Sequence, residues 1–542
     1  MVTIRLAAEP EAVAVRAPSI VDMLDDAATG HGTVQFVGED PEPTPIGALW
    51  DESERAARWI AATVGTGGNV AAVLTNSRAC VATLFGAWRA GCTVASLPLP
   101  SPGMAPQLYA EQITRFCNVA GAQALMLDPA HMPLLADAPT ANHTFDEALA
   151  GGPRFSSGAD GALVQFTSGS VGTPKGIYLT LDAVGAHVEA ILAALQPGDG
   201  AGSCSWLPLS HDMGLIGQLL SPLAAGAPRL GHHRLTLMKP EAFVANPRSW
   251  LRTCAQTRST ITVAPNFALE LAVRTSGRIG SLDLSSLESL IVGSEAVHAD
   301  TLGRFADAFE PLGFRPLAFC PAYGMAEATL AVTIVRPNEP WHSTVLADDA
   351  APETLSRPIV STGFPVDGCE VRVTEPDGAV GPIQFRSPSM LSRYIGADLR
   401  LTADGFFATG DVGVMDRGEL FVVGRGDEVI VVAGRNLYPA DIETAVKHEA
   451  IRPGCVAAVA APGGGLAIVV EPKASKATSE ELELACRRIR TLVAGQTGCA
   501  PSTVAFIPRG SLPKTPSGKV RRLAIRNSLA TGDGLLARVD FG

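Results

Sequence analysis

The sequence predicts an α/β protein whose large N-terminal part, built on two sheets and a small β-barrel, precedes a small α+β lid domain. The chain has 542 residues, which is too long for one ordinary core. Short apolar runs alternate with amphipathic stretches along most of it, and from about residue 360 the pattern changes to short alternating strands. A hydrophobic content of 46% with 18% charged residues is typical of a loop-rich globular enzyme.

The first part of the chain has the pattern of strands followed by helices. The run at 70–74 reads as a buried strand, and 80–91 reads as the helix after it. Further apolar runs at 163–166, 259–265 and 287–297 each lead into a turn marked by glycine or proline. Ligands of such sheets bind at the carboxyl ends of the strands, so these turns are the candidate site.

The last third of the chain has a different pattern. Alternating strands at 369–387 and 418–434 predict the small β-barrel. A compact α+β pattern follows, with helices or strands expected at 439–450, 455–461, 465–472, 479–496 and 502–508. We therefore expect a large N-terminal domain at 1–424, a hinge at 425–428 and a C-terminal lid domain at 429–542.

Charge, cysteine pattern and hydropathy argue against several classes of protein. The net charge of −12 comes without a long acidic or basic block, which disfavours a nucleic-acid partner. The ten cysteines include no CxxC pair, as is typical of free core thiols in a reduced compartment. Glu9 and Glu11 interrupt the N-terminal apolar stretch, and no run of 18 apolar residues occurs. We expect a cytoplasmic protein without a membrane span.

Residues 163–177, LVQFTSGSVGTPKGI, form the most informative stretch. Glycines allow close backbone approach, hydroxyl groups can bind phosphate oxygens, and a lysine adds positive charge. The order is not GxxxxGK[ST], which excludes a P-loop NTPase. The stretch resembles the phosphate loop of the adenylate-forming superfamily: acyl-CoA synthetases, acyl-AMP ligases, luciferases and peptide-synthetase adenylation domains. The resemblance implies phosphate contacts from Thr167, Ser168, Gly169, Ser170, Gly172, Thr173 and Lys175.

Two segments resemble fatty acyl-AMP ligases on the acid side. WLPLSHDMGLIG (206–217) resembles their acyl-site motif and implies that His211 lies beside the reacting carboxylate, with Ser210 in place of the usual tyrosine. The stretch 238–274 resembles them over nearly 40 residues. Its apolar residues could form either a pocket wall or ordinary core: Phe243, Trp250, Phe267 and Leu269.

The motif PAYGMAEATL at 321–330 resembles the segment that receives adenine and metal in the same superfamily. It implies that Glu327 helps to hold Mg²⁺ on the ATP phosphates, since this hard cation prefers oxygen ligands. Ala326 favours the acyl-AMP branch, because most of the superfamily has threonine there. The resemblance implies adenine contacts from Ala322, Tyr323 and Gly324, and from Gly293, Ser294 and Glu295 in IVGSEAV.

The last motifs complete the superfamily's set in its usual order. In TGDVG, Asp411 is expected to accept the ribose hydroxyls, and Arg425 to reach ribose or phosphate oxygens. Asp427 falls at the usual hinge position. In LPKTPSGKVRR, Lys519 is expected to be the lid lysine that meets the carboxylate and the α-phosphate, where its charge offsets that of two approaching anions.

These resemblances together imply an enzyme that activates a carboxylic acid. A fatty or bulky apolar acid would attack the α-phosphorus of Mg·ATP to give acyl-AMP, and lid rotation would then present a phosphopantetheine thiol of a carrier protein or CoA. An amino-acid substrate is disfavoured, because peptide-synthetase domains usually place an aspartate for the ammonium where this chain has the segment at 211–214.

Two alternatives stay open on the sequence alone. Val171 stands where the superfamily usually has threonine, which motivates an enzyme that only transfers preformed acyl-AMP to CoA. A non-catalytic acyl or nucleotide binder is disfavoured because Lys175, Glu327 and Asp411 are retained. The stretch 333–363 looks shorter than the insertion usual in acyl-AMP ligases, so CoA also stays open as acceptor.

Overall fold

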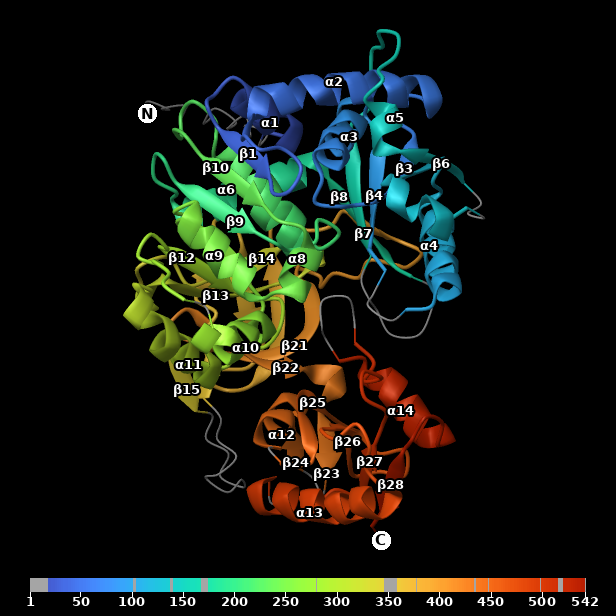
Figure 1. Ribbon diagram of the computed structural model, residues 1–542, viewed down its shortest axis with the longest axis vertical. Coiled ribbons are helices and arrows are strands. Elements are labelled where there is room, and N and C mark those ends of the chain that lie inside the picture. Colours follow the sequence, from blue (N-terminus) through green and yellow to red (C-terminus); the bar gives the residue numbers. More distant parts are fainter. Residues whose placement is uncertain are drawn as a thin grey trace, which may run out of the picture.

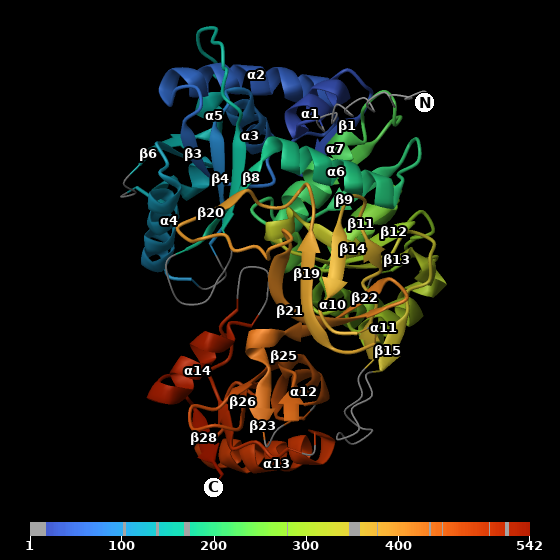
Figure 2. The same cartoon turned by 180° about the vertical axis from the view of Figure 1, so that it is seen from behind.

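The computed structural model describes residues 18–100, 104–136, 140–166, 174–278, 280–345, 358–376, 378–432, 435–446, 448–497, 499–514 and 520–541. A large unit holds sheets flanked by helices, and a smaller unit below it holds the C-terminal strands and helices (Figure 1). The view from behind shows the same two units (Figure 2). The fold class is α/β, as the sequence predicts.

One sheet of the large unit has seven strands. Five neighbouring strands run parallel, and the two strands at one edge are antiparallel to their neighbours. In spatial order they are β20 (Arg393–Ile395), β8 (Gly176–Thr180), β7 (Ala162–Phe166), β4 (Thr93–Leu97), β3 (Asn69–Val73), β5 (Ala124–Leu127) and β6 (Ala141–Thr144). One face is covered by α4 (Pro106–Ala120); the other by α2 (Ile46–Thr63), α3 (Arg78–Arg89) and α5 (Phe145–Ala148). The strand expected at 70–74 and the helix expected at 80–91 are β3 and α3.

The second sheet has nine strands and is parallel from β1 through β13. Its order is β17 (Phe364–Pro365), β14 (Ala331–Ile334), β13 (Phe319–Gly324), β12 (Ser289–Val292), β11 (Ile261–Ala264), β9 (Gly202–Ser205), β10 (Arg234–Leu237), β1 (Thr33–Phe36) and β2 (Thr44–Pro45). The predicted strands at 259–265 and 287–297 are β11 and β12. Their carboxyl ends share one edge with those of β9 and β13, which gathers the motif-bearing loops there.

Helices of several lengths surround the second sheet. They are α1 (Ile20–Ala28), α6 (Leu181–Leu195), the π-helix η2 (Met213–Leu220), α7 (Ser221–Ala224), α8 (Pro240–Ala245), α9 (Arg248–Gln256), α10 (Asn266–Thr275) and α11 (Ala299–Phe309). Short 3₁₀ turns occur at η1 (Pro129–Leu134), η3 (Ser276–Arg278), η4 (Glu310–Leu312), η5 (Pro316–Ala318), η6 (Ala326–Ala328) and η8 (Gly426–Glu428).

The small β-barrel that the sequence predicts corresponds to a four-stranded antiparallel sheet. Its strands are β18 (Glu370–Val373), β19 (Gly381–Arg386), β21 (Phe407–Asp416) and β22 (Glu419–Arg425), in that order. A separate pair joins β15 (Ser343–Val345) to β16 (Pro358–Val360). The hairpin of β21 and β22 matters most, because it carries two of the predicted site residues.

The C-terminal unit is α+β and has its own apolar core, separate from that of the large unit. Its elements are β23 (Ile430–Val432), β24 (Arg435–Leu437), α12 (Pro439–Ala445), β25 (Ile451–Ala460), β26 (Leu466–Pro472), α13 (Ser479–Thr497), β27 (Thr503–Phe506), α14 (Arg522–Thr531) and β28 (Ala537–Asp540). The helix expected at 439–450 is shorter than predicted. It ends at Ala445, because Val446 adopts a ψ of 86° that turns the chain toward β25.

All ten cysteines are buried and free of disulfides, as expected for core thiols. Within the described ranges, no helix combines the length and apolar character needed to cross a membrane.

Candidate functional site

Several predicted site residues meet where β13 ends and the β21–β22 hairpin begins. Strand register places Asp411 on β21 directly opposite Arg425 on β22, and their side chains lie 3.5 Å apart. The Tyr323 hydroxyl, from β13, donates a hydrogen bond of 2.5 Å to Asp411 Oδ2. Residues 88 positions apart in the chain are thus joined by tertiary structure.

Asp411 is held rigidly and is only 9% exposed. Its backbone N–H donates to Thr409 Oγ1 at 3.0 Å, which fixes the turn that carries the carboxylate. Burial, followed by the charge of Asp411, raises the pKa of the Tyr323 hydroxyl well above its usual value. Tyr323 is therefore a neutral donor and Asp411 a charged acceptor, a combination suited to hold hydroxyl groups of a ligand.

The Arg425 guanidinium contacts Asp411 and also residues Asp427 and Thr409. Its Nε donates to Asp427 Oδ1 at 3.0 Å and its Nη1 to the Thr409 carbonyl at 3.2 Å. Asp427 is 69% exposed at its side chain. The predicted ribose arginine is therefore in contact with the predicted hinge residue.

Glu327 lies on the turn η6 beside the start of β14 and is half-buried. Its Oε1 accepts a hydrogen bond of 3.0 Å from the Tyr394 hydroxyl. Burial raises the pKa of the Glu327 carboxyl, because the charged form has lost much of its hydration. A cation bound there would offset that penalty, so the oxygen donors and the charge fit Mg²⁺.

Tyr394 is a candidate site residue that the sequence reasoning missed. It lies on β20, which pairs with β8, the strand that follows Lys175. The Lys175 ammonium is 5.9 Å from the centroid of the Tyr394 ring, while the hydroxyl of the same ring reaches Glu327. One signal was available: the chain has only five tyrosines, and this one stands in a polar, glycine-marked stretch.

His211, which the sequence predicts to lie beside the acid, precedes the π-helix η2. Its Nδ1 lies 2.6 Å from Asp212 Oδ1 and accepts a hydrogen bond of 3.3 Å from the Met213 N–H, and these contacts orient the ring. Its Nε2 faces the Ser294 hydroxyl at 3.5 Å. Gly214 must lack a side chain, because a Cβ there would lie 2.2 Å from the Pro208 carbonyl oxygen.

The segment after β12 is shaped by local constraints. Ser294 has a φ of 72°, in the left-handed region that disfavours residues other than glycine. Glu295 Oε1 accepts from the Phe267 N–H at 2.6 Å, so this predicted nucleotide residue caps the first turn of α10. A Cβ on Gly293 would come within 3.0 Å of the Ala322 carbonyl oxygen.

Gly324 is required for a reason that differs from the expected approach of a purine. A Cβ at this position would lie 1.8 Å from the Leu330 carbonyl oxygen. That oxygen accepts from the Met325 N–H at 2.8 Å and closes the turn that bears Glu327. The glycine therefore shapes the Glu327 turn.

Most of the apolar residues considered for a pocket wall belong to the core. Phe243, Trp250 and Leu269 are at most 1% exposed. Phe243 stacks on Trp206 with ring centroids 3.6 Å apart. Phe267 is different, because it is 36% exposed and meets Trp206 edge-on. It stays a candidate for contact with the acid.

Seven residues of the phosphate loop and the lid lysine lie outside the described residues: Thr167, Ser168, Gly169, Ser170, Val171, Gly172, Thr173 and Lys519. The structure does describe the residues on either side of these two segments. Phe166 pairs with Gly176 where β7 joins β8, which brings the two ends of the phosphate loop together. Lys514 forms an antiparallel bridge with Val520, on either side of the segment that contains Lys519.

An ionic cluster lies where the predicted hinge, residues 425–428, meets the C-terminal unit. Arg522 donates to Glu428 Oε2 at 2.6 Å and to both oxygens of Glu443 at 2.9 and 3.0 Å. Burial raises the pKa of both carboxyls, and the guanidinium opposes that shift. Glu428 is thereby bound to the C-terminal unit, whereas Arg425 belongs to β22 of the large unit.

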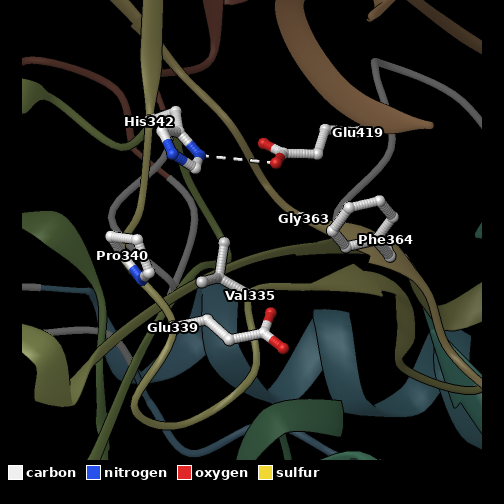
Figure 3. Close-up of a pocket in the computed structure, with 7 residues that line it drawn as sticks. All are labelled: Val335, Glu339, Pro340, His342, Gly363, Phe364 and Glu419. Atoms are coloured by element: carbon white, nitrogen blue, oxygen red, sulfur yellow. Dashed lines mark ion pairs between the residues drawn. The ribbon is translucent and has the colours of Figure 1, made fainter. Parts of the chain in front are cut away.

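A separate hollow of about 270 Å³ lies at the far end of β14 (Figure 3). His342 and Glu419 form an ion pair of 3.3 Å across it, beside the ring of Phe364. None of the predicted site residues lines it. The motifs therefore do not converge on this hollow.

Comparison with known proteins shows the family of this chain. Residues 27–395 match the family of AMP-binding enzymes. A putative ligase of Mycobacterium tuberculosis, Rv1013, is 32% identical over 88% of this chain and 94% of its own. The medium-chain-fatty-acid–[acyl-carrier-protein] ligase JamA of Moorena producens is 35% identical over 68% of each chain.

A solved structure supports the same assignment at the level of the whole fold. It comes from work on fatty acyl-adenylate ligases of E. coli and L. pneumophila and superposes with a TM-score of 0.85 at 25% identity. The superposition covers 95% of this chain and 98% of that one. Family match, full-length relative and fold agree, and the chain belongs to the AMP-binding family of adenylate-forming ligases.

Proposed function

We propose that this enzyme uses ATP to convert a fatty or bulky apolar carboxylic acid into acyl-AMP and then transfers the acyl group to a phosphopantetheine thiol. The observation that carries the proposal is the meeting of Asp411, Tyr323 and Arg425 at contacts of 2.5 and 3.5 Å. A buried carboxylate flanked by a neutral hydroxyl and a guanidinium is suited to a nucleoside with neighbouring hydroxyls and a phosphate.

The nucleotide side divides into two tasks. Asp411 accepts the ribose hydroxyls and releases the Tyr323 hydroxyl when it does so, which frees that ring to lie against adenine. Arg425 and Lys175 face the phosphates, and the hydroxyl-rich loop at 167–173 supplies further donors. Gly293 and Ala322, packed closely where β12 and β13 end, support one wall of the adenine site.

Glu327 would hold Mg²⁺, with the Tyr394 hydroxyl keeping its carboxylate in place. When bound, this cation supplies positive charge to the ATP phosphates.

Adenylation needs no nucleophilic side chain. A carboxylate oxygen of the acid forms a bond to the α-phosphorus, the bond from that phosphorus to the bridging oxygen breaks, and pyrophosphate leaves with the electron pair. His211, oriented by Asp212, lies on the acid side, and Lys519 offsets the charge of the two anions. A thiolate then attacks the acyl carbonyl and AMP leaves.

We propose that residues 429–542 act as a lid on a domain formed by 1–424, with rotation about 425–428. The separate apolar cores support this division. The name of the JamA relative specifies an acyl carrier protein, which supports a carrier protein as the partner here, with CoA as the competing acceptor. The use of ATP and the ten free thiols support a cytoplasmic location.

A second candidate function rests on Val171. The missing hydroxyl would weaken the hold on the β- and γ-phosphates but leave acyl-AMP binding nearly unchanged. Such an enzyme would transfer preformed acyl-AMP to CoA without making it.

One experiment separates these functions. The protein is incubated with ATP, Mg²⁺ and a panel of acids that differ in chain length while pyrophosphate release is followed. Preformed acyl-AMP is then supplied with CoA or with a phosphopantetheinylated carrier protein. Pyrophosphate release with thioester formed only on the carrier supports the main proposal. Thioester formation from acyl-AMP without pyrophosphate release identifies the second function. If neither product forms in either assay, the protein is a non-catalytic acyl or nucleotide binder.

A further inference from the structure

His187 is a buried histidine that the proposed chemistry does not use. It lies on α6, is 0% exposed and stands 144 residues before its hydrogen-bond partner on β14. The Ala331 N–H donates to His187 Nε2 at 2.8 Å, and His187 Nδ1 lies 3.0 Å from Ser389 Oγ. Since a backbone N–H can only donate, Nε2 is the acceptor, and Nδ1 carries the proton that is donated to Ser389.

Both partners of His187 belong to the structure around Glu327. The turn from Met325 to Leu330 is closed by three backbone hydrogen bonds: 2.8 Å from Met325 N to the Leu330 oxygen, 2.9 Å from Ala328 N to the Met325 oxygen, and 3.0 Å from Thr329 N to the Ala326 oxygen. Within this turn Thr329 has a φ of 75°, a costly conformation for a β-branched residue. The strained turn needs outside support, and His187 provides it at Ala331.

Ser389 connects the imidazole to the other side of the same turn. Its Oγ lies 3.4 Å from the Ala328 carbonyl oxygen, to which it can donate, and its own carbonyl accepts from the Thr329 hydroxyl. Two residues further on, the Leu391 N–H donates to the Glu327 carbonyl at 2.8 Å. The segment from Ser389 to Tyr394 therefore forms hydrogen bonds with the backbone of the Glu327 turn as well as with the Glu327 carboxylate.

We infer that His187 is a positioning residue for adenylation, which holds the Glu327 turn and the segment from Ser389 to Tyr394 in register through its neutral imidazole. This inference rests on the proposed role of Glu327 in holding Mg²⁺. Burial lowers the pKa of His187 to about 4, in agreement with the neutral ring that its two hydrogen bonds require.

This role predicts that a variant of His187 affects the two half-reactions differently. Pyrophosphate release depends on the placement of Glu327, whereas thioester formation from supplied acyl-AMP does not. Loss of the imidazole should therefore slow the first half-reaction and spare the second. A residue that acts only through overall stability would lower both together.

The test compares variants at two buried histidines. His187→Leu removes both hydrogen bonds, and His187→Gln keeps an acceptor near the position of Nε2. The matched control is His233→Leu, because His233 is also buried, at 3% exposure, and bonds Ser203 Oγ at 3.0 Å in a part of the second sheet remote from Glu327. Ser389→Ala gives a second route to the same contact should His187→Leu fail to fold.

For His187→Leu we expect pyrophosphate release, measured as kcat/KM for Mg·ATP, to fall about 10- to 100-fold, the usual cost of removing support from a metal-holding residue. Thioester formation from acyl-AMP should stay near that of the unaltered enzyme, and His187→Gln should recover part of the loss. A readout independent of turnover is Mn²⁺ affinity by electron paramagnetic resonance with a non-hydrolysable ATP analogue. It should weaken for His187→Leu and Ser389→Ala and not for His233→Leu.

Parallel loss of both half-reactions in His187→Leu, or unchanged Mn²⁺ affinity in the folded variants, would overturn the positioning role while leaving the proposed function intact. An unaltered enzyme that releases no pyrophosphate with any acid would instead overturn the proposed function, and this inference with it.

Discussion

The proposed nucleotide side and the proposed acid side of the site differ in how firmly they are built. On the nucleotide side Asp411 is 9% exposed and bonded to Tyr323 at 2.5 Å, and Glu327 is bonded to Tyr394 at 3.0 Å. On the acid side His211 approaches Ser294 only at 3.5 Å, and its ring is 29% exposed. In the first group Asp411, Tyr323 and Tyr394 lie on strands and Glu327 lies on the short turn η6, whereas the second group lies on loops beside a π-helix. A part common to every substrate can be rigid, while the part that meets the variable acid can differ.

The largest expected effect is on the free energy of unfolding, and it distinguishes a core residue, Phe243, from a candidate pocket-wall residue, Phe267. Phe243→Ala should lower the free energy of unfolding by about 3–5 kcal/mol, because it removes a fully buried ring stacked on Trp206. Phe267→Ala should change stability by less than about 1 kcal/mol but alter the dependence of pyrophosphate release on acid chain length. Chemical denaturation and the acid panel measure the two effects. Equal stability losses would place Phe267 in the core and remove it from the acid side.

The next effect tests the rigid nucleotide side. Asp411→Asn removes the negative charge that pairs with Arg425 and that would bind the ribose hydroxyls. We expect kcat/KM for ATP to fall roughly 100-fold, which corresponds to about 3 kcal/mol. Asp416→Asn, at the exposed end of the same strand, is the matched control. Pyrophosphate release against ATP concentration measures both. If the two variants behave alike, Asp411 has no nucleotide role.

A smaller effect concerns Tyr394 and has a defined sign with pH. Burial raises the pKa of Glu327, and the Tyr394 hydroxyl lowers it by stabilising the carboxylate. Tyr394→Phe should raise that pKa further. Because the ionised form is needed, the acid limb of the pH profile of pyrophosphate release should move to higher pH, with about a tenfold loss below the limb. Tyr178→Phe, on the neighbouring strand β8, should leave the limb in place, and a shift toward lower pH in Tyr394→Phe would contradict the assignment.

The smallest effect tests the phosphate loop itself. Val171→Thr should raise pyrophosphate release at low ATP by an amount that corresponds to about 0.5–1.5 kcal/mol, the value of one ordinary hydrogen bond. A rate of thioester formation from preformed acyl-AMP serves as the internal control. An unchanged rate of pyrophosphate release would mean that valine is tolerated, and the second candidate function would lose its main support.

Sequence reasoning reached further on the fold than on the contacts within the site. The apolar runs at 70–74 and 163–166 predict β3 and β7 because buried parallel strands need continuous apolar side chains. Tyr394 was missed because its role depends on the pairing of β20 with β8, which joins segments more than 200 residues apart. For Glu295 the motif implied nucleotide contact, which stays a prediction, and the tertiary structure adds a hydrogen bond from the Phe267 N–H that caps α10.

The sequence by itself determined the family, the order of the motifs and the chemical types of the groups that carry charge, because these depend on local patterns and residue identity. Only the tertiary structure decided which groups touch: Tyr323 with Asp411, Tyr394 with Glu327, and His187 with Ala331. The physical reason is that buried polar groups must be paired, and the partner available to each is set by strand register and helix packing between segments that are distant in the chain.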